Sequence, residues 1–156
     1  MVNTHSWSCY VLILEVENPV EATTMKKLFR VEPGVYFYVG SSRKPHSALA
    51  RIARHLSRFK KTRWHIDALT TNRSTRVKGV LLISSENERF DCESAIARLL
   101  LKAEYSYVPG FGCSDKQRDL SHLFRCRKTD AVMCAEELYS LLEEAGFNAV
   151  YAEVDS

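Results

Sequence analysis

The sequence predicts an α/β domain in which helices flank a small antiparallel sheet of three strands. Three apolar segments, residues 9–16, 35–39 and 77–84, have the length and the aliphatic or aromatic content of β-strands. Segments with the spacing of amphipathic helices follow the second and the third of them. The order strand, strand, helix, strand, helix therefore indicates a sheet covered by helices.

The chain is expected to form one domain. Its 156 residues are enough to bury a core, and no internal repeat, low-complexity tract or domain boundary interrupts them. We expect a single domain over residues 1–156, with a core at about 9–124 and an acidic C-terminal extension at about 129–156. No segment resembles a signal peptide or is long enough to span a bilayer, so the sequence predicts a cytoplasmic protein.

The first two strands are expected to be antiparallel neighbours. The connection between them, residues 17–34, has turn residues at both ends and is long for a hairpin. Side chains alternate along a strand, so Tyr36 and Tyr38 should share one face and their apolar neighbours the other. Gly40 and two serines follow, which predicts a tight turn.

Residues 47–58 are predicted to form an amphipathic helix with Ser47 as its N-cap. An apolar stripe with i, i+3, i+4, i+7 spacing consists of Leu49, Ile52, Ala53 and Leu56. A basic stripe with the same spacing consists of Arg51, Arg54, His55 and Arg58. We expect the apolar stripe to pack and the basic stripe to be presented.

The rest of the chain continues this alternation. We expect a short helix within residues 60–71, a central third strand at 77–84, a helix from about Asp91 to Glu104, a loop at 107–115, a helix near 131–145 and a last strand at 147–154. In the helix after the third strand, Glu93 shares a face with apolar residues three, four and seven positions later. Its carboxylate is therefore predicted to point toward the fold.

The charge is unevenly distributed along the chain. The net charge is +3, and eleven of the 22 Lys and Arg residues lie between Arg43 and Lys78, with Asp67 the only acid among them. From Thr129 to the end there are seven acids and no base. The middle of the chain is therefore suited to a polyanion, although basic residues that merely decorate a solvated helix would give the same pattern.

Five cysteines are present, and none forms a CxxC pair. In a cytosolic chain they are most simply buried free thiols. The one candidate zinc site combines Cys113, His122 and Cys126.

Several motifs together resemble the GIY-YIG nuclease superfamily. "YVG" at 38–40 resembles the second half of the motif that names it, "LARIARH" at 49–55 the helix with its arginine, and Glu93 in "CESAIARLL" its metal-binding glutamate. The chain is more closely similar to a small family of prokaryotic GIY-YIG-like domains, some of them fused to endonuclease III. That similarity includes "YVGSS", "RHL", "WHIDAL", "VPGFGCSD" and "SHLF", and it runs from about Tyr10 to Phe124.

The first tyrosine of the superfamily motif has two candidates. "GVY" at 34–36 places Tyr36 on the same strand as Tyr38, whereas superfamily members place the two tyrosines on adjacent strands. Tyr10 in "SCYVLIL" is the better equivalent, with Ser8 and Cys9 in place of the glycine and isoleucine.

The resemblance implies a metal-dependent endonuclease that hydrolyses DNA phosphodiester bonds, in repair or in the processing of structured DNA. Glu93 would bind Mg²⁺ or Mn²⁺, which suits an ion that keeps much of its water shell. Arg51 would neutralise the scissile phosphate, and Tyr10 and Tyr38 would orient the attacking water, one of them as general base. His55 is a further candidate for the base or for a phosphate ligand.

A second set of residues is expected to bind the nucleic acid, DNA or RNA. The set consists of Gly40, Ser41, Arg54, Arg58, Lys60, Lys61, Arg63, Trp64 and His65. Basic residues interleaved with rings suit a phosphate backbone and an unpaired base, although Trp64 is equally suited to a core. Asp67 could orient His65. Ser41 and Ser42 stand where other superfamily branches often have a lysine, which disfavours a lysine-assisted mechanism.

Two other functions fit the same sequence. The first is a nucleic-acid-binding module without catalysis, which shares salt-sensitive binding with the nuclease but not metal-dependent cleavage. The second is a protein-interaction domain whose basic face meets an acidic partner. A DNA-repair protein is a further candidate partner.

Overall fold

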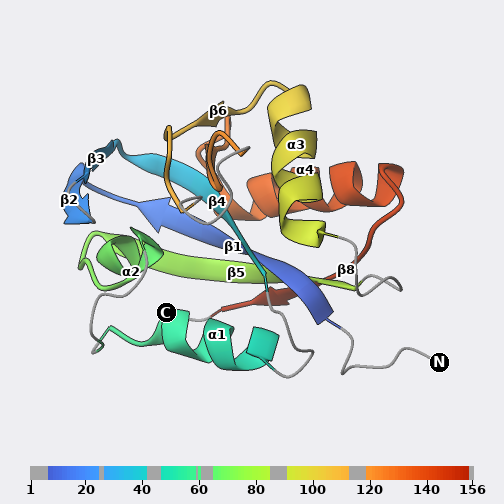
Figure 1. Cartoon of the computed structure of the whole chain (residues 1–156), viewed down its shortest axis with the longest axis horizontal. Helices are drawn as coiled ribbons and strands as arrows, with labels where there is room; N and C mark the ends of the chain where they lie inside the picture. Colours follow the sequence, from blue (N-terminus) through green and yellow to red (C-terminus); the bar gives the residue numbers. More distant parts are fainter. Residues whose placement is uncertain are drawn as a thin grey trace.

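The computed structural model describes residues 7–24, 27–41, 47–58, 60, 65–84, 91–112 and 119–154. Its elements are β1 (Trp7–Val16), β2 (Val20–Thr24), β3 (Lys27–Val31), β4 (Gly34–Ser41), α1 (Ser47–Leu56), α2 (His65–Thr70), β5 (Thr75–Ser84), α3 (Cys92–Lys102), β6 (Ser106–Tyr107), β7 (Leu123–Arg125), α4 (Ala131–Glu144) and β8 (Asn148–Glu153). Helices α1 and α2 lie on one side of the main sheet, and α3 and α4 on the other (Figure 1).

The main sheet has six strands in the order β6-β7-β4-β1-β5-β8, and every pair of neighbours is antiparallel. The predicted antiparallel sheet between helices is confirmed, but its predicted size of three strands is wrong. The strands β6 and β7 have two and three residues, too few for an alternating pattern to be visible. The last strand was expected, and it extends the sheet by pairing with β5.

The strands β1 and β4 are antiparallel neighbours, as predicted. Their long connection folds into a separate hairpin of β2 and β3. Val20, Phe29 and Val31 bury this hairpin against the same side of the sheet as α2. Along β4, Tyr36 and Tyr38 belong to that core, while the alternate apolar residues belong to the core beneath α3 and α4. The predicted alternation is therefore confirmed.

The prediction for the two faces of α1 is wrong. Leu49 and Leu56 are 56% and 44% exposed, whereas His55 is 1% exposed. The basic stripe turns toward the sheet because Asp67, which is fully buried on α2, pairs with Arg54. A buried carboxylate without a partner would cost more than two exposed leucines.

The four cysteines among the described residues are buried, as expected, but they are not free thiols. One disulfide bond joins Cys9 to Cys92, which are 83 positions apart in the sequence, and a second joins Cys126 to Cys134, which are 8 positions apart. The zinc combination of Cys113, His122 and Cys126 is thereby excluded as a complete ligand set, and Cys113 lies outside the described residues. Within the described part of the chain, no cluster of three His, Cys, Asp or Glu side chains could hold a metal ion.

Within the ranges given above, no helix is long and apolar enough to cross a membrane.

The two disulfides should contribute unequally to stability. All four sulfur atoms belong to buried residues, so replacing either pair by alanine removes similar packing. In the loop-closure model the longer loop makes the first pair worth about 2 kcal/mol more than the second. We expect Cys9→Ala with Cys92→Ala to lower the free energy of unfolding by that much more than Cys126→Ala with Cys134→Ala, measured by urea denaturation. Equal losses in the free energy of unfolding for the two pairs would contradict the assignment of these two disulfide bonds.

Candidate active site

Two tyrosines meet on adjacent strands. In the β1–β4 register Tyr10 lies opposite Gly40 and Leu12 opposite Tyr38, so the two phenols are diagonal neighbours on one face of the sheet. Tyr10 and Tyr38 therefore lie on adjacent strands, as expected. Tyr36 lies on the same strand as Tyr38, opposite Leu14. The Tyr36 hydroxyl donates instead to the carbonyl oxygen of Glu32, at 2.7 Å.

Gly40 makes room for a side chain of this protein. A Cβ atom at position 40 would lie 2.4 Å from Cζ of Tyr10 and 2.5 Å from its hydroxyl oxygen. The Tyr10 ring therefore lies directly over the Gly40 backbone. The glycine is within β4 rather than in a turn, and its contribution to the site is to admit this ring.

Helix α1 supplies a histidine and an arginine to the tyrosines. The Tyr10 hydroxyl lies 2.8 Å from Nε2 of His55, and its oxygen is also hydrogen-bonded to Arg51. A guanidinium can only donate, so Arg51 donates to the phenol oxygen, and the phenol proton is available to the imidazole. A further Nη1 hydrogen of Arg51 is donated to the carbonyl oxygen of Ser41, at the end of β4. The ring of Tyr38 packs edge-on against His55, with centroids 6.0 Å apart.

Burial sets the protonation of these groups. It raises the pKa of Tyr10 above the ordinary value of 10.0, although the Arg51 charge opposes the shift. Burial also raises the pKa of Tyr38, helped by the nearby Tyr10 and Glu93 charges. For His55, burial and then the Lys60 charge lower the pKa to about 4. At neutral pH the site therefore holds two phenols and a neutral imidazole.

Glu93 approaches from the first turn of α3. The helix begins after the N-cap Asp91, whose side chain accepts from the Ser94 N–H at 3.1 Å. Glu93 is 8% exposed and shares its face with buried Ile96, as the sequence predicted. Its charge raises the pKa of both Tyr10 and Tyr38, so it lies within electrostatic range of the two phenols.

A buried histidine holds Glu93. Nδ1 of His122 lies 2.6 Å from Oε1 of Glu93, in an ion pair whose N–H is not aligned with the oxygen. Nε2 lies 2.7 Å from Oδ2 of Asp119, which accepts from the Ser94 hydroxyl at 2.7 Å. Burial alone would lower the pKa of His122, but contact with the two carboxylates raises it above 6.5.

A second buried carboxylate engages the basic residues of α1. Arg54 donates to Oδ1 of Asp67 at 2.6 Å, and Nζ of Lys60 is 3.9 Å from the same oxygen. Lys60 also donates to the carbonyl oxygens of Arg54 and His55, at 2.7 and 3.3 Å, and so caps the C-terminal end of α1. Burial lowers the Lys60 pKa to about 8, although Asp67 opposes it.

The other predicted nucleic-acid contacts lie apart from this cluster. Arg58 donates to the carbonyl oxygens of Asn72 and Thr75. His65 is packed between the rings of Phe29 and Phe111, and its Nδ1 accepts from the Gly112 N–H at 2.8 Å. The expectation that Asp67 orients His65 is therefore wrong. Lys61, Arg63 and Trp64 lie outside the described residues.

The structure thus joins Tyr10, Tyr38, Arg51 and His55 through direct contacts, with Gly40 and Ser41 beneath them, and places Glu93 of α3 within electrostatic range of the two phenols. Sequence reasoning missed Asp119 and Ser94 and considered His122 as a zinc ligand rather than as a partner of Glu93. Asp119 and His122 are three positions apart but lie outside any helix, where this spacing predicts no contact, so no sequence pattern indicated the pair.

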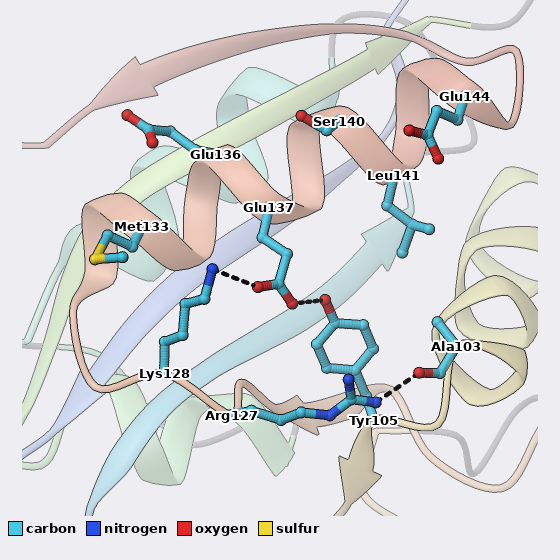
Figure 2. A pocket seen from close by; sticks show the side chains of 10 residues that line it. All are labelled: Ala103, Tyr105, Arg127, Lys128, Met133, Glu136, Glu137, Ser140, Leu141 and Glu144. Carbon is cyan, nitrogen blue, oxygen red and sulfur yellow. Dashed lines mark hydrogen bonds and ion pairs between the residues drawn. The ribbon is translucent and has the colours of Figure 1, made fainter.

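A hollow of about 430 Å³ lies on the other side of the sheet, beside α4 and the end of α3 (Figure 2). No predicted site residue lines it. Glu137 contacts both Tyr105 and Lys128, and Arg127 donates to the carbonyl oxygen of Ala103. These polar groups already have hydrogen-bond or ion-pair partners within the protein, so we assign no function to the hollow.

A family model described as a domain of unknown function, DUF123, matches residues 9–144. Comparison with curated proteins and with solved structures gives no match.

Replacing Gly40 by alanine should strain the site. The new methyl group would overlap the Tyr10 ring, so we expect a loss of about 1–3 kcal/mol in the free energy of unfolding. In a Tyr10→Ala background the same change should cost almost nothing, because the ring is gone. A double-mutant cycle followed by urea denaturation measures this coupling. Additive losses would show that the ring does not lie over Gly40.

His55 should make stability depend on pH. Its pKa is about 4 in the folded protein against 6.5 for an ordinary histidine, so the unfolded chain binds more protons between those values. This contribution to stability is complete above pH 6.5 and is lost as the pH falls toward 4. Between pH 7 and pH 4 the wild type should lose about 3 kcal/mol more than His55→Gln in urea denaturation. Parallel pH profiles for the two proteins would contradict a buried, neutral His55.

Proposed function

The chain belongs to the family described as domain of unknown function DUF123, and we propose that its activity is metal-dependent endonucleolytic hydrolysis of DNA. The observation that carries this proposal is the convergence of Tyr10, Tyr38, Arg51, His55 and Glu93 from four separate elements. The resemblance of the same residues to the GIY-YIG superfamily supports it. Repair or processing of structured DNA is the corresponding role.

The donor set around Glu93 fits Mg²⁺ or Mn²⁺. His122 contacts Oε1, and among the described residues Oε2 has no partner. One carboxylate oxygen, with waters and a substrate phosphate to complete the shell, is the usual protein share of a magnesium site. A bound ion would supply Lewis acidity at the phosphate and lower the pKa of nearby water and phenol. Glu93 would hold it, and no other described residue is assigned as a ligand.

Tyr10 and His55 are arranged to take the proton of the attacking water. Tyr10 alone is a poor base, because burial raises its pKa. Its hydroxyl is 2.8 Å from the neutral His55, so it can pass its proton to Nε2 while it accepts one from the water. A phosphate anion in the site would raise the pKa of His55 and favour this transfer. Tyr38 packs against His55 and fixes the ring.

Arg51 is the candidate phosphate ligand. Its guanidinium is anchored to the Ser41 carbonyl and to the Tyr10 hydroxyl, which fixes its position before substrate arrives. A preset cation beside the phenol can stabilise charge that develops on the phosphate oxygens. Arg54 and Arg58 are engaged with Asp67 and with backbone carbonyls, so the proposal does not depend on them.

The proposal predicts a specific pattern of cleavage. Labelled duplex, single-stranded, flap and junction DNAs would be incubated with Mg²⁺, Mn²⁺ or EDTA. We expect metal-dependent product from wild type, a loss of about 100-fold or more in Glu93→Gln and Tyr10→Phe, and a loss of at least about 100-fold in Arg51→Ala. Glu136→Gln, an exposed glutamate on α4, is the matched control and should cleave like wild type.

Two outcomes would contradict the proposal. Salt-sensitive binding without product in either metal would indicate a nucleic-acid-binding module instead. Cleavage that survives in Glu93→Gln and in EDTA would place the chemistry elsewhere.

A further inference from the structure

His122 is a fully enclosed titratable residue near the candidate site. It is 0% exposed and lies between two carboxylates, Glu93 at 2.6 Å and Asp119 at 2.7 Å. Nε2 is hydrogen-bonded to Asp119 and Nδ1 lies against Glu93, so the ring contacts both carboxylates. The mechanism proposed above does not use this residue, although it contacts the group on which that mechanism depends.

The position of His122 is fixed by its backbone. Its N–H donates to the carbonyl oxygen of Phe111 at 2.8 Å, and its carbonyl oxygen accepts from the Val39 N–H at 2.9 Å. Val39 lies between Tyr38 and Gly40 on β4. His122 is thus tied to the strand that carries one phenol, and its side chain reaches the carboxylate on α3.

The contacts of His122 form a closed path. From Glu93 the path passes through the His122 ring to Asp119, and from Asp119 to the Ser94 hydroxyl at 2.7 Å. Ser94 is adjacent to Glu93 in the first turn of α3. The imidazole can therefore neither rotate nor withdraw without breaking a contact with the same helix turn.

We propose that His122 is a positioning residue that orients the Glu93 carboxylate so that Oε2 faces a divalent cation. This inference rests on the proposed function. The imidazole contacts Oε1, and the backbone hydrogen bond between Val39 and His122 links the residue that contacts Glu93 to the strand that carries Tyr38. Outer groups that orient a ligating carboxylate act on metal affinity through that ligand.

Two substitutions of His122 separate positioning from packing. The amide nitrogen of asparagine reaches about where Nδ1 stands, so His122→Asn retains a donor to Glu93 and loses the contact with Asp119. The amide nitrogen of glutamine reaches about where Nε2 stands, so His122→Gln retains Asp119 and loses Glu93. Each variant removes one of the two contacts, and a purely structural role predicts similar effects from both.

The test measures Mn²⁺ binding directly and without DNA. Free Mn²⁺ would be followed by electron paramagnetic resonance during titration of wild type, His122→Asn, His122→Gln and Glu93→Gln. We expect the Kd of His122→Gln to rise about 10–100-fold and that of His122→Asn to stay within about threefold of wild type. Cleavage assays should show the same order in the Mn²⁺ concentration needed for half-maximal rate.

Several results would overturn the proposal, and they are distinguishable. Equal Kd values for the two His122 variants would reduce His122 to a packing role while leaving the nuclease intact. No difference between wild type and Glu93→Gln in Mn²⁺ binding would remove the metal site, and with it both proposals. If the His122 variants do not fold, Asp119→Asn provides the test. It keeps the shape of the Asp119 side chain and leaves the contact between His122 and Glu93, so the Kd should stay within about threefold of wild type, as in His122→Asn. A rise of about 10-fold or more would show that Asp119 sets the metal affinity and would reject the role assigned to the Glu93 contact.

Discussion

Burial of ionised carboxylates is the constraint on which the rest of the site depends. Asp67, Glu93 and Asp119 are 0%, 8% and 8% exposed, and a buried charge without a partner is among the most costly features a fold can contain. Each carboxylate is therefore matched to a basic side chain. Asp67 takes Arg54 from α1, and Glu93 and Asp119 share His122. These pairings determine which sides of α1 and α3 face the sheet.

The same pairings explain why the phenols and the cations meet. When α1 turns its basic side inward to reach Asp67, it also brings Arg51 and His55 to Tyr10, because these residues lie on one face of the helix. The β1–β4 register then supplies Tyr38 as the diagonal neighbour of Tyr10. The geometry of the site therefore follows from two features, the pairing of buried Asp67 with Arg54 and the register of the antiparallel strands β1 and β4.

Sequence patterns predicted the long strands, the helices, the alternation in β4 and the inward face of Glu93, because these are local properties. The residues of the candidate site came from the resemblance to the GIY-YIG superfamily. They could not predict the orientation of α1, because its apolar stripe satisfies the helical pattern while Asp67, which decides the orientation, is more than ten positions away. The contact between His122 and Glu93 was missed for a similar reason, because the two residues are remote in sequence. Strands as short as β7 leave no period to detect.

The central claim is that Glu93 is a metal ligand next to Tyr10 and Arg51. Crystals of the protein soaked in Mn²⁺ would test it through the anomalous scattering of the metal, which locates the ion independently of activity. The account predicts a peak at about 2.1 Å from Oε2 of Glu93, with His122 still on Oε1. A peak elsewhere in the molecule, or none in crystals whose Glu93 is ordered, would contradict it.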